Sequence, residues 1–599
     1  MKRAEIGVER YLEIRSAYHP TFGYDQALFF LYNVTGTPQV WRQDADTPWP
    51  KQISFFPERV LGLSANPKRD LLRVSLDAGG NERSQIYLMD GEGLNVKDIT
   101  GDPAHIYQAG SWSHDGSLLS YATNKRNGVY FDVYVYDVET AEHRLVHESD
   151  ATNYALGFTP DDRHVIVSRH HESLHNDLYL VDIATGELTH LTPHEGVARF
   201  SARFTRDGKQ LFLITDLDNQ FMRLSVVHQE TGERNWLTDD DWDVTGVSMD
   251  IHNRYVAYTR NVDGNTELTV LERNESGVLR ELDDLPDLPA GVFGVHWDRD
   301  GRRLAISHSG PRSGNEIWLL DIVTRDLRRT TYASISGVPQ HTFVEAELIH
   351  YPTFDGRQIP ALYYKPSHKE GPYPTVIDVH GGPESQSVNS FAGLTQYFVE
   401  RGFAVLKTNV RGSAGYGRDY LHLDDVRKRM DSVADLAHAV DWLVESGQAR
   451  RDAVAVMGGS YGGFMVLAAV THYPTLFAAG VDIVGIANLR TFMENTSAYR
   501  RHLRESEYGT IADDGEFFDE ISPIHHVDKI QAPMFIVHGA NDPRVPVDEA
   551  EQMVSALRTR NHPVEYLRFE DEGHGLAKLA NRIEAYTKIV QFLEEKLPL

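Results

Sequence analysis

The sequence predicts two domains of different fold class, a β-propeller followed by an α/β domain with a mostly parallel sheet. Its 599 residues are more than one hydrophobic core normally supports. The first half repeats at a regular interval, and in the second half apolar strands alternate with helical stretches. We expect an N-terminal segment at 1–17 that can pack on the C-terminal domain, the propeller at 18–336 and the α/β domain at 337–599.

The repeats of the first half each contain an apolar or aromatic residue, a polar turn and an apolar strand, as in Trp112–Gly116, Phe204–Gly208 and Trp297–Gly301. The last five repeats start at residues 112, 158, 204, 249 and 297, which places them 45–48 residues apart. Repeats of about 40–50 residues with several strands are typical of propeller blades. With one repeat from residue 63 and a weaker one at Phe22–Trp41, we predict seven blades, and six or eight stay open. A β-sandwich array fits the interval less well.

The second half begins with a predicted hairpin, in which Asp355-Gly356 joins two strands. Apolar strands then alternate with helical stretches, and a linker is expected near residues 337–343. Buried parallel strands separated by helices indicate an α/β sheet. The predicted strands are 375–379, 404–407, 454–457, 480–484, 534–537 and 564–569.

The most informative motif is the Gly-x-Ser-x-Gly elbow at Gly458–Gly462, centred on Ser460. An apolar strand precedes it and a buried helix follows, and this context is typical of the nucleophile of an α/β-hydrolase domain. The glycines are needed because strand and helix backbones approach closely at such a turn. For the bare pattern, a chance Gly/Ser turn is the alternative, so the decision depends on partner residues.

Two partners follow Ser460 in the order that this fold requires. A serine hydroxyl needs a general base, and the base needs an orienting carboxylate. Asp542 comes just after the strand 534–537, and His574 lies between two glycines after the last strand. A turn aspartate and a loop histidine are the alternatives for each residue alone. Because all three stand in order at strand ends, we predict Ser460 as nucleophile, His574 as general base and acid, and Asp542 as the orienting carboxylate.

A predicted oxyanion hole completes the site. His380-Gly381-Gly382-Pro383 directly follows the first parallel strand, and a glycine-rich turn there can aim a backbone N–H at the developing negative charge. We predict that Gly382 and Tyr461 supply the two N–H donors. A simple strand-end turn is the alternative for Gly382.

The composition excludes several classes of function. The net charge of −28 disfavours nucleic-acid and acidic-membrane binding, and solubility explains it best. The absence of cysteine excludes disulfides and thiolate metal sites and makes the cytoplasm the default location. No apolar run is long enough for a transmembrane helix, and the first ten residues do not resemble a secretory signal. His170, His171 and His175 have no carboxylate in a recognised ligand spacing, so we expect surface histidines and no metal site.

Five motifs together resemble the prolyl oligopeptidase family of serine peptidases; they lie at 380–383, 409–417, 458–463, 542–546 and 573–575. The His-Gly-Gly-Pro turn and the Ser-Tyr-Gly-Gly elbow are most similar to its acylaminoacyl-peptidase branch. The resemblance covers the whole chain, propeller included. It implies hydrolysis of short peptides in a cavity between the domains, without a cofactor, with the propeller excluding folded proteins. In that family oligomerisation often contributes to gating, so a homo-oligomer is an expected partner arrangement.

One departure from the family concerns the Glu-Glu pair with which dipeptidyl-peptidase members bind a substrate's free α-amine. The sequence has no convincing counterpart, because the acidic stretch Asp239–Asp243 is better explained as a solvated turn within a blade. This departure makes dipeptidyl aminopeptidase activity less expected without excluding it.

Three arginines form a weaker signal: Arg500, Arg501 and Arg504 lie close in sequence to the predicted active-site loops. Arg500 and Arg504 would share a helix face, where paired guanidinium groups could bind a substrate's C-terminal carboxylate. The alternative, which we favour, is a solvated helix face with Arg501 paired to Glu505. Arg411 and Tyr416 could either shape the cleft or fix a loop.

The sequence thus predicts a two-domain serine exopeptidase or oligopeptidase that acts on short, N-acylated peptides through an acyl-enzyme. A carboxypeptidase that uses the arginines is one alternative, and an esterase or amidase for small acyl compounds is another, because one triad hydrolyses both bond types. A binding protein that uses the propeller and carries an inactive hydrolase half belongs to a different class.

Overall fold

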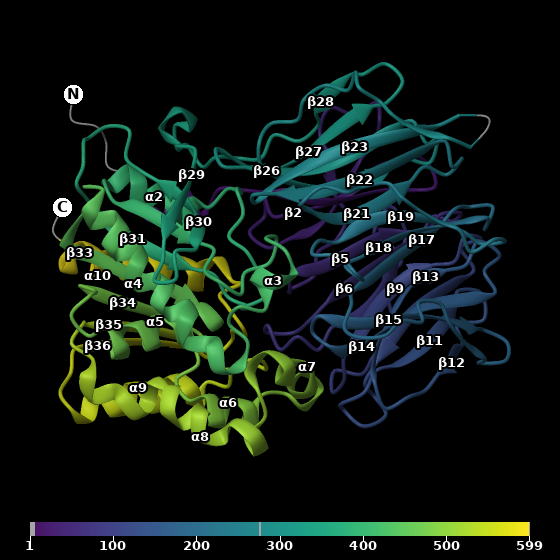
Figure 1. Ribbon diagram of the computed structural model, residues 1–599. Coiled ribbons are helices and arrows are strands. Elements are labelled where there is room, and N and C mark those ends of the chain that lie inside the picture. Colours follow the sequence, from purple (N-terminus) through teal and green to yellow (C-terminus); the bar gives the residue numbers. More distant parts are fainter. Residues whose placement is uncertain (1–5, 275–276, 598–599) are drawn as a thin grey trace.

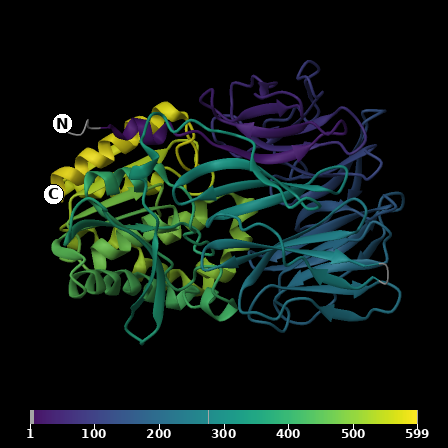
Figure 2. The same ribbon diagram turned by 90° about the horizontal axis from the view of Figure 1, so that it is seen from above.

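The computed structural model describes residues 6–274 and 277–597 and consists of two halves that lie side by side (Figure 1). The chain starts on the left-hand half with α1 (Val8–Leu12), crosses to the propeller on the right, and returns through residues 330–346. Seen from above, α1 lies beside the long last helix α10 (Leu579–Lys596) (Figure 2). The N-terminal segment therefore packs with the C-terminal half, although propeller residues follow it directly.

The propeller has seven blades, as predicted, each a four-stranded antiparallel sheet built from consecutive strands. Blades 1 to 4 comprise β1 (Ala17–Phe22), β2 (Leu28–Tyr32), β3 (Gln39–Gln43), β4 (Lys51–Gln52); β5 (Val60–Ala65), β6 (Leu72–Leu76), β7 (Gln85–Met89), β8 (Lys97–Asp98); β9 (Tyr107–Trp112), β10 (Leu118–Thr123), β11 (Asp132–Asp137), β12 (His143–His147); β13 (Thr152–Phe158), β14 (His164–Glu172), β15 (His175–Asp182) and β16 (Leu188–His190). Blades 5 to 7 comprise β17 (Phe200–Phe204), β18 (Gln210–Thr215), β19 (Arg223–His228), β20 (Arg234–Trp236); β21 (Asp243–Met249), β22 (Tyr255–Val262), β23 (Asn265–Arg273), β24 (Leu279–Glu281); β25 (Val292–Trp297), β26 (Arg303–Gly310), β27 (Ser313–Asp321) and β28 (Leu327–Arg329).

The repeated turns link neighbouring blades to one another. The turn after β9 contains Gly116 at a φ of +74°, and a Cβ there would lie 2.4 Å from Asn66 Oδ1 of the preceding blade. Asn66 also donates its side-chain amide to the Gly116 carbonyl at 2.9 Å. In the same way the His114 N–H donates to Asp162 of the next blade at 2.7 Å. The turn residues that repeat in the sequence therefore hold the ring together as well as reversing the chain.

The ring closes through side-chain contacts, because in the described residues blade 1 and blade 7 exchange no strand. Their shared core joins Phe22, Phe30 and Tyr32 of the first blade to Ile317 and Leu319 of the last. Buried apolar area, together with polar contacts such as Thr21 to His296 at 3.4 Å, therefore connects the two ends of the propeller.

The C-terminal half is built on one eight-stranded sheet, and its α/β-hydrolase fold agrees with the prediction. The order is β29-β30-β32-β31-β33-β34-β35-β36. The last six strands of the chain run parallel to one another, and β30 runs antiparallel to both of its neighbours, β29 and β32. The bounds are β29 (Glu347–Pro352), β30 (Gln358–Tyr364), β31 (Tyr373–Val379), β32 (Ala404–Thr408), β33 (Ala449–Gly459), β34 (Ala479–Ile483), β35 (Met534–Gly539) and β36 (Val564–Phe569).

Helices cover both faces of this sheet. One apolar core contains residues of α1, α2 (Gly393–Arg401) and α10; the other contains residues of α4 (Arg429–Glu445), α5 (Tyr461–His472), α6 (Leu489–Asn495), α8 (Ile511–Ile521) and α9 (Asp548–Thr559). The short α3 (Arg418–Leu421) and α7 (Ala498–Tyr508) lie toward the propeller (Figure 1). Short 3₁₀ turns occupy Gln340–Thr342, Val426–Lys428 and Pro523–Lys529.

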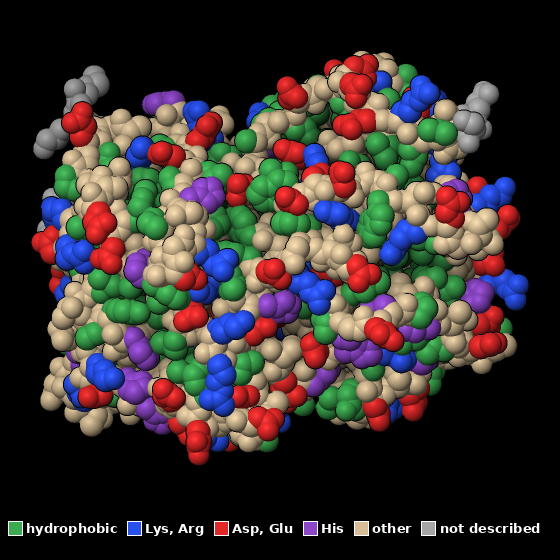
Figure 3. Space-filling model, viewed as in Figure 1, with side chains coloured by type: hydrophobic (Ala, Val, Ile, Leu, Met, Phe, Trp, Pro, Cys, Tyr) green, Lys and Arg blue, Asp and Glu red, His purple; other side chains and the backbone are tan. Residues whose placement is uncertain are grey.

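Charged side chains of both signs are interspersed over the face shown in Figure 3. The net negative charge is therefore not collected into one acidic area on that face, which agrees with a role in solubility. No helix in the described parts of the chain is both long and apolar enough to cross a membrane.

Candidate active site

Ser460 lies at a sharp turn between β33 and α5, in a strained backbone conformation with φ +59° and ψ −120°. The turn is possible because its neighbours lack side chains. A Cβ on Gly462 would lie 2.2 Å from the Val379 carbonyl oxygen of β31, and one on Gly458 would lie 2.5 Å from the Gly462 carbonyl oxygen. The Ser460 N–H donates to the Ile483 carbonyl at 2.9 Å and ties the turn to β34. A strained, over-determined serine at a strand end is the geometry of a nucleophile elbow.

Asp542 and His574 meet at the carboxyl ends of β35 and β36. His574 Nδ1 lies 2.7 Å from Asp542 Oδ2, and the second carboxylate oxygen accepts the N–H groups of Arg544 and Val545 at 2.8 and 3.0 Å. Burial alone would raise the pKa of Asp542, but the hydrogen bond and charge of His574, with the backbone donors, hold it below its usual value. The aspartate is thus a buried, ionised group that fixes one tautomer and orientation of the imidazole.

The loop that carries His574 is held by a second buried carboxylate. Glu572 accepts the N–H groups of Ala577 and Lys578, both at 2.9 Å, and the side-chain amide of Asn581 at 2.9 Å. These three donors anchor both sides of the loop around the histidine. As a result, His574 is only 11% exposed but does not lie within the packed core.

The predicted oxyanion loop lies against the nucleophile turn. A Cβ on Gly381 would lie 3.2 Å from the Ser460 Cβ, and Gly382 has a φ of +132°, which favours glycine. His380 anchors the loop, since its Nε2 lies 2.8 Å from the Ser413 hydroxyl. Asn409 anchors the loop further along, where its Oδ1 accepts the Ser387 N–H at 2.7 Å.

Arg411 and Tyr416, whose roles the sequence left open, hold this supporting loop. Arg411 forms a two-point contact with buried Asp435, with Nη2–Oδ1 at 2.9 Å and Nε–Oδ2 at 3.0 Å. The Tyr416 hydroxyl accepts the Asn409 side-chain amide at 2.9 Å. Both residues therefore fix the loop that positions the glycine-rich turn, which explains why motif 409–417 accompanies motif 380–383.

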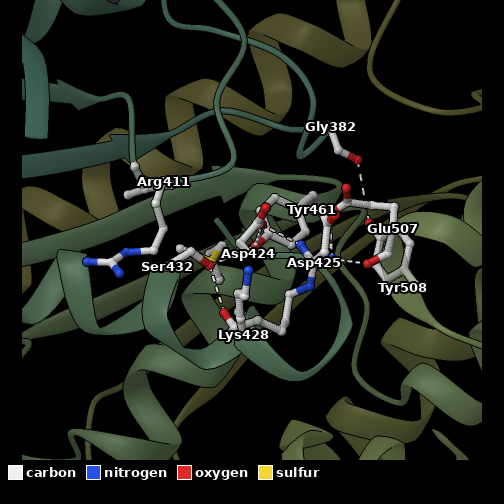
Figure 4. A network of polar contacts seen from close by, with 12 residues as sticks. Gly382, Arg411, Asp424, Asp425, Lys428, Ser432, Tyr461, Glu507 and Tyr508 are labelled. Atoms are coloured by element: carbon white, nitrogen blue, oxygen red, sulfur yellow. Dashed lines mark hydrogen bonds and ion pairs between the residues drawn. The ribbon is translucent and has the colours of Figure 1, made fainter. Parts of the chain in front are cut away.

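Tyr461, which follows the serine, is fully buried, and its hydroxyl enters a polar network (Figure 4). The hydroxyl donates to Asp424 Oδ2 at 2.9 Å and lies 2.8 Å from the Ser432 hydroxyl. Arg429 bridges Asp424 and Glu507, with an N–O distance of 2.5 Å to each. Burial raises the pKa of Asp424 to about 6 although the Arg429 charge acts in the opposite direction.

Comparison with known families agrees with this geometry. Residues 389–598 match the model of the prolyl oligopeptidase family, and residues 74–284 match that of the TolB β-propeller domain. The C-terminal half of the chain therefore belongs to the prolyl oligopeptidase family of serine peptidases. This confirms the resemblance that the five motifs indicated.

The relatives differ in the substrates that their names state. Dipeptidyl aminopeptidase BIII of Pseudoxanthomonas mexicana is 28% identical in an alignment of length 600, which covers 92% of this chain and 82% of the relative. Acylamino-acid-releasing enzyme 2 of Oryza sativa subsp. japonica is 28% identical over 258 residues, 41% of this chain and 33% of the relative. The names of these relatives therefore state two different peptide specificities.

Solved structures agree with the fold of the whole chain. A prolyl endopeptidase has a TM-score of 0.86 at 17% identity and covers 98% of this chain and 91% of its own. A puromycin-hydrolyzing peptidase of Mycobacterium tuberculosis has a TM-score of 0.84 at 19% identity, covering 100% of this chain and 97% of its own. At these identities the likeness concerns the arrangement of propeller and hydrolase domains.

The propeller reaches helix α7 and the loop that carries Asp542 through Glu82, between β6 and β7. Glu82 Oε2 binds Arg500 Nη2 of α7 at 2.7 Å, and Oε1 binds Arg544 Nε at 2.6 Å. Arg544 is the second residue after Asp542. The sequence reasoning missed Glu82 and Arg544; the motif 542–546 already contained the arginine, but nothing in the sequence paired it with a residue of blade 2.

The three predicted arginines of α7 occupy different environments. Arg500 is paired to Glu82 rather than solvated, so the expectation of a solvated helix face is wrong for this residue. Arg501 donates to the Glu494 carbonyl oxygen instead of pairing with Glu505. Arg504 stacks over the Phe492 ring at 4.7 Å and forms no ion pair within 4.0 Å among residues 6–274 and 277–597, although the charge of Glu384 acts on it. The helix face is therefore largely turned into the protein.

Two further expectations about the propeller need correction or detail. The stretch Asp239–Asp243 is not simply a solvated turn, because Asp240 pairs with Arg260, and buried Asp243 accepts the Met222 N–H at 2.8 Å. His170 and His175 are partly buried, and of the three histidines only His171 is exposed as expected. Its Nε2 lies 2.9 Å from Asp177, a partner from the next strand.

A cavity of about 720 Å³ opens beside Asp542, at the boundary between the two halves. The propeller contributes residues such as Asn81 and His105 to its lining, and the hydrolase domain contributes Tyr499 and Asp542. A space of this size, walled by both domains, is within the range of small-molecule and short-peptide sites.

Proposed function

We propose that this chain hydrolyses short peptides through an acyl-enzyme, with Ser460 as nucleophile, His574 as general base and acid, and Asp542 as the carboxylate that orients it. The 2.7 Å contact between His574 and Asp542, at strand ends beside the strained Ser460 turn, carries the proposal. In the first step the Ser460 oxygen attacks the scissile carbonyl carbon while His574 takes its proton. His574 then protonates the leaving amine, and water repeats the sequence to release the acid.

The developing negative charge on the carbonyl oxygen would be stabilised by backbone donors. We assign this role to the N–H groups of Gly382 and Tyr461, because the glycine-rich turn packs against Ser460 and Tyr461 opens helix α5. Donors that are already oriented in a water-poor site stabilise such charge strongly, and losing one costs about 10²–10³ in kcat.

For the substrate we propose short peptides with a blocked, uncharged N-terminus, as in acylaminoacyl peptidases. The observation that supports this is Glu82, the carboxylate that the propeller presents toward the catalytic loops. Both of its oxygens already bind arginines, so it does not offer free negative charge to a substrate α-ammonium. The cavity between the two domains supports a limit on substrate size.

Arg504 favours a second candidate, a carboxypeptidase. A guanidinium that forms no ion pair within 4.0 Å in the described residues, close to the active-site loops, could bind the C-terminal carboxylate of a peptide. Arg500 is less suited to that role, because Glu82 already neutralises it.

A hydrolysis panel on a single peptide separates these candidates. The panel contains free-amine, N-acetylated, free-carboxylate and amidated forms, and a small ester. We expect kcat/KM at least 10-fold higher for the N-acetylated peptide than for the free amine. The opposite preference would overturn the acylaminoacyl assignment, and cleavage of the ester alone would favour an esterase.

The matched variant for the second candidate is Arg504→Met. If the enzyme is a carboxypeptidase, this variant loses activity on free-carboxylate peptides and keeps it on amides. Equal effects on both forms would remove the carboxypeptidase candidate. Arg450→Met, at the partly exposed start of the central strand β33 and away from the propeller, is the control.

A further inference from the structure

A buried ion network lies directly behind the residue that follows the nucleophile (Figure 4). Its centre is Arg429 at the start of α4, whose side chain is 1% exposed. Arg429 binds Asp424 Oδ2 and Glu507 Oε1, each at 2.5 Å, and also donates to the Glu507 carbonyl oxygen at 2.6 Å. Breaking a buried pair of this kind leaves an uncompensated charge, so the three groups are fixed relative to one another.

The network is connected to one side of the proposed oxyanion hole through the hydroxyl of Tyr461. The hydroxyl donates to the same oxygen, Asp424 Oδ2, that accepts from Arg429. Ser432, one turn along α4 from Arg429, lies 2.8 Å from the hydroxyl on its other side. Because the Tyr461 side chain is held at its far end, the backbone N–H of the same residue has little freedom to tilt away from Ser460.

The network also reaches the opposite side of the proposed oxyanion hole. Tyr508, next to Glu507, directs its hydroxyl to the Gly382 carbonyl oxygen at 3.5 Å. The Arg429 guanidinium lies between two aromatic rings, 5.1 Å from the centroid of Tyr461 and 4.9 Å from that of Tyr508. One cation therefore contacts the two tyrosines that touch the two proposed donor segments.

The proximity of the carboxylates of Asp424, Asp425 and Glu507 can be explained without a metal ion. Oxygens of Asp424, Asp425 and Glu507 lie within 4.8 Å of one another, which is close enough for a shared cation. However, the guanidinium of Arg429 already occupies the space between Asp424 and Glu507 and would repel a second cation. The positive charge that this cluster needs is supplied by the chain itself.

We propose that Asp424, Arg429 and Glu507 act as positioning residues, which hold Tyr461 and the Gly382 turn so that their N–H groups converge on the substrate oxygen. None of the three touches the reacting atoms. Their effect on the reaction is to keep the two donors oriented before charge develops, which is the condition under which such donors are effective. The inference rests on the serine-peptidase mechanism proposed above.

The decisive variant is Tyr461→Phe, which removes one oxygen and keeps the ring that stacks on Phe464. We expect kcat to fall about 10–100-fold, with KM within about 2-fold of wild type, because the ground-state carbonyl needs the donors less than the transition state does. A peptide aldehyde, which forms an oxyanion on Ser460, should lose affinity by the same factor as kcat. A non-reactive peptide amide of the same sequence should bind unchanged.

The control is Tyr363→Phe, which removes another buried hydroxyl of the same domain, one that donates to Gln448 at 3.3 Å. It should match wild type in kcat and aldehyde affinity. Ser432→Ala is the milder variant, expected to lower kcat about 3–10-fold, and it decides the question if Tyr461→Phe does not fold.

The outcomes separate this inference from the proposed function. Wild-type enzyme that neither hydrolyses peptides nor reacts with the aldehyde contradicts the mechanism itself. An active wild type with unchanged kcat in Tyr461→Phe and Ser432→Ala overturns the positioning role alone. Equal losses in kcat, aldehyde binding and amide binding would indicate a structural role only, and would also overturn it.

Discussion

Among single residues near the nucleophile, hydrogen bonding decides which buried carboxylates carry charge. Asp542 is buried, yet its partners hold its pKa below the usual value. Asp482 lies behind the same elbow on β34, between Gly463 and Gly485, and burial raises its pKa to about 7. The first residue is suited to orienting a histidine, whereas the second favours its protonated form up to neutral pH.

We expect Asp482 to lower the free energy of unfolding of the protein as pH rises. Between about pH 4 and 7 the native state holds a proton that the unfolded chain releases, so ionisation costs free energy only in the folded protein. Asp482→Asn removes this cost, and we expect the unfolding free energy at pH 8 to rise by about 1–3 kcal/mol. The gain should shrink toward pH 4. Calorimetry of both proteins across this range provides the measurement; a gain independent of pH would contradict the argument.

Among elements, the turn from β33 into α5 brings several backbone segments of the site into close contact. Gly462 faces the backbone of β31 and Gly458 faces that of Gly462, so the close approach of strand and helix, rather than chain flexibility, requires them. The same approach brings the Ser460 turn and the 380–383 turn into contact.

Gly462→Ala tests this packing, because its Cβ would lie 2.2 Å from the Val379 carbonyl oxygen. Overpacking against a backbone atom should destabilise the hydrolase domain by about 2–4 kcal/mol and abolish most activity. The control is Gly294→Ala on β25, where a Cβ meets no atom within 4 Å. Equal thermal stability of the two variants would show that the close approach is tolerated.

Several elements could be predicted from the sequence because their signals are local. The strands that became β35 and β36 are continuous apolar or alternating segments, and the elbow is a contiguous motif with its strand and helix beside it. The contacts of the segment 409–428 could not be predicted from such local signals. Its side chains find partners on α4, α7 and the 380–387 loop, which no local periodicity encodes.

At the scale of the whole molecule, a propeller loop contacts the segments that carry both His574 and Asp542. A Cβ on Gly80 would lie 2.8 Å from the Gly573 nitrogen, and Glu82 binds the arginine two residues after Asp542. The loops that carry Asp542 and His574 are therefore packed from both sides only when the two domains are together.

Glu82→Gln should weaken this contact. It leaves Arg500 and Arg544 without their shared counter-charge, and a largely buried guanidinium without a partner is costly. We expect kcat/KM to fall about 10-fold, the equivalent of about 1.4 kcal/mol. The control is Glu139→Gln, which breaks an exposed pair with Arg69 inside the propeller and should have little effect. Equal activities of the two variants would argue against coupling between the domains.

The contact between Glu82 and Arg500 spans 418 residues of sequence, and this separation shows where sequence reasoning ends. The blade count followed from the repeat interval, and the order of Ser460, Asp542 and His574 followed from the strand pattern. The pairing of a propeller glutamate with two arginines, and of Tyr461 with Asp424 and Ser432, depends on how the domains and loops dock. For the same reason the environment of Arg500 was predicted wrongly.

The most direct test of the proposed mechanism is labelling with a fluorophosphonate, followed by identification of the modified residue by mass spectrometry. We predict one covalent adduct per chain on Ser460, complete loss of labelling in Ser460→Ala, and loss of peptide hydrolysis in parallel with the adduct. A folded wild-type protein that hydrolyses peptides without labelling at Ser460, or that labels at another residue, would contradict the mechanism.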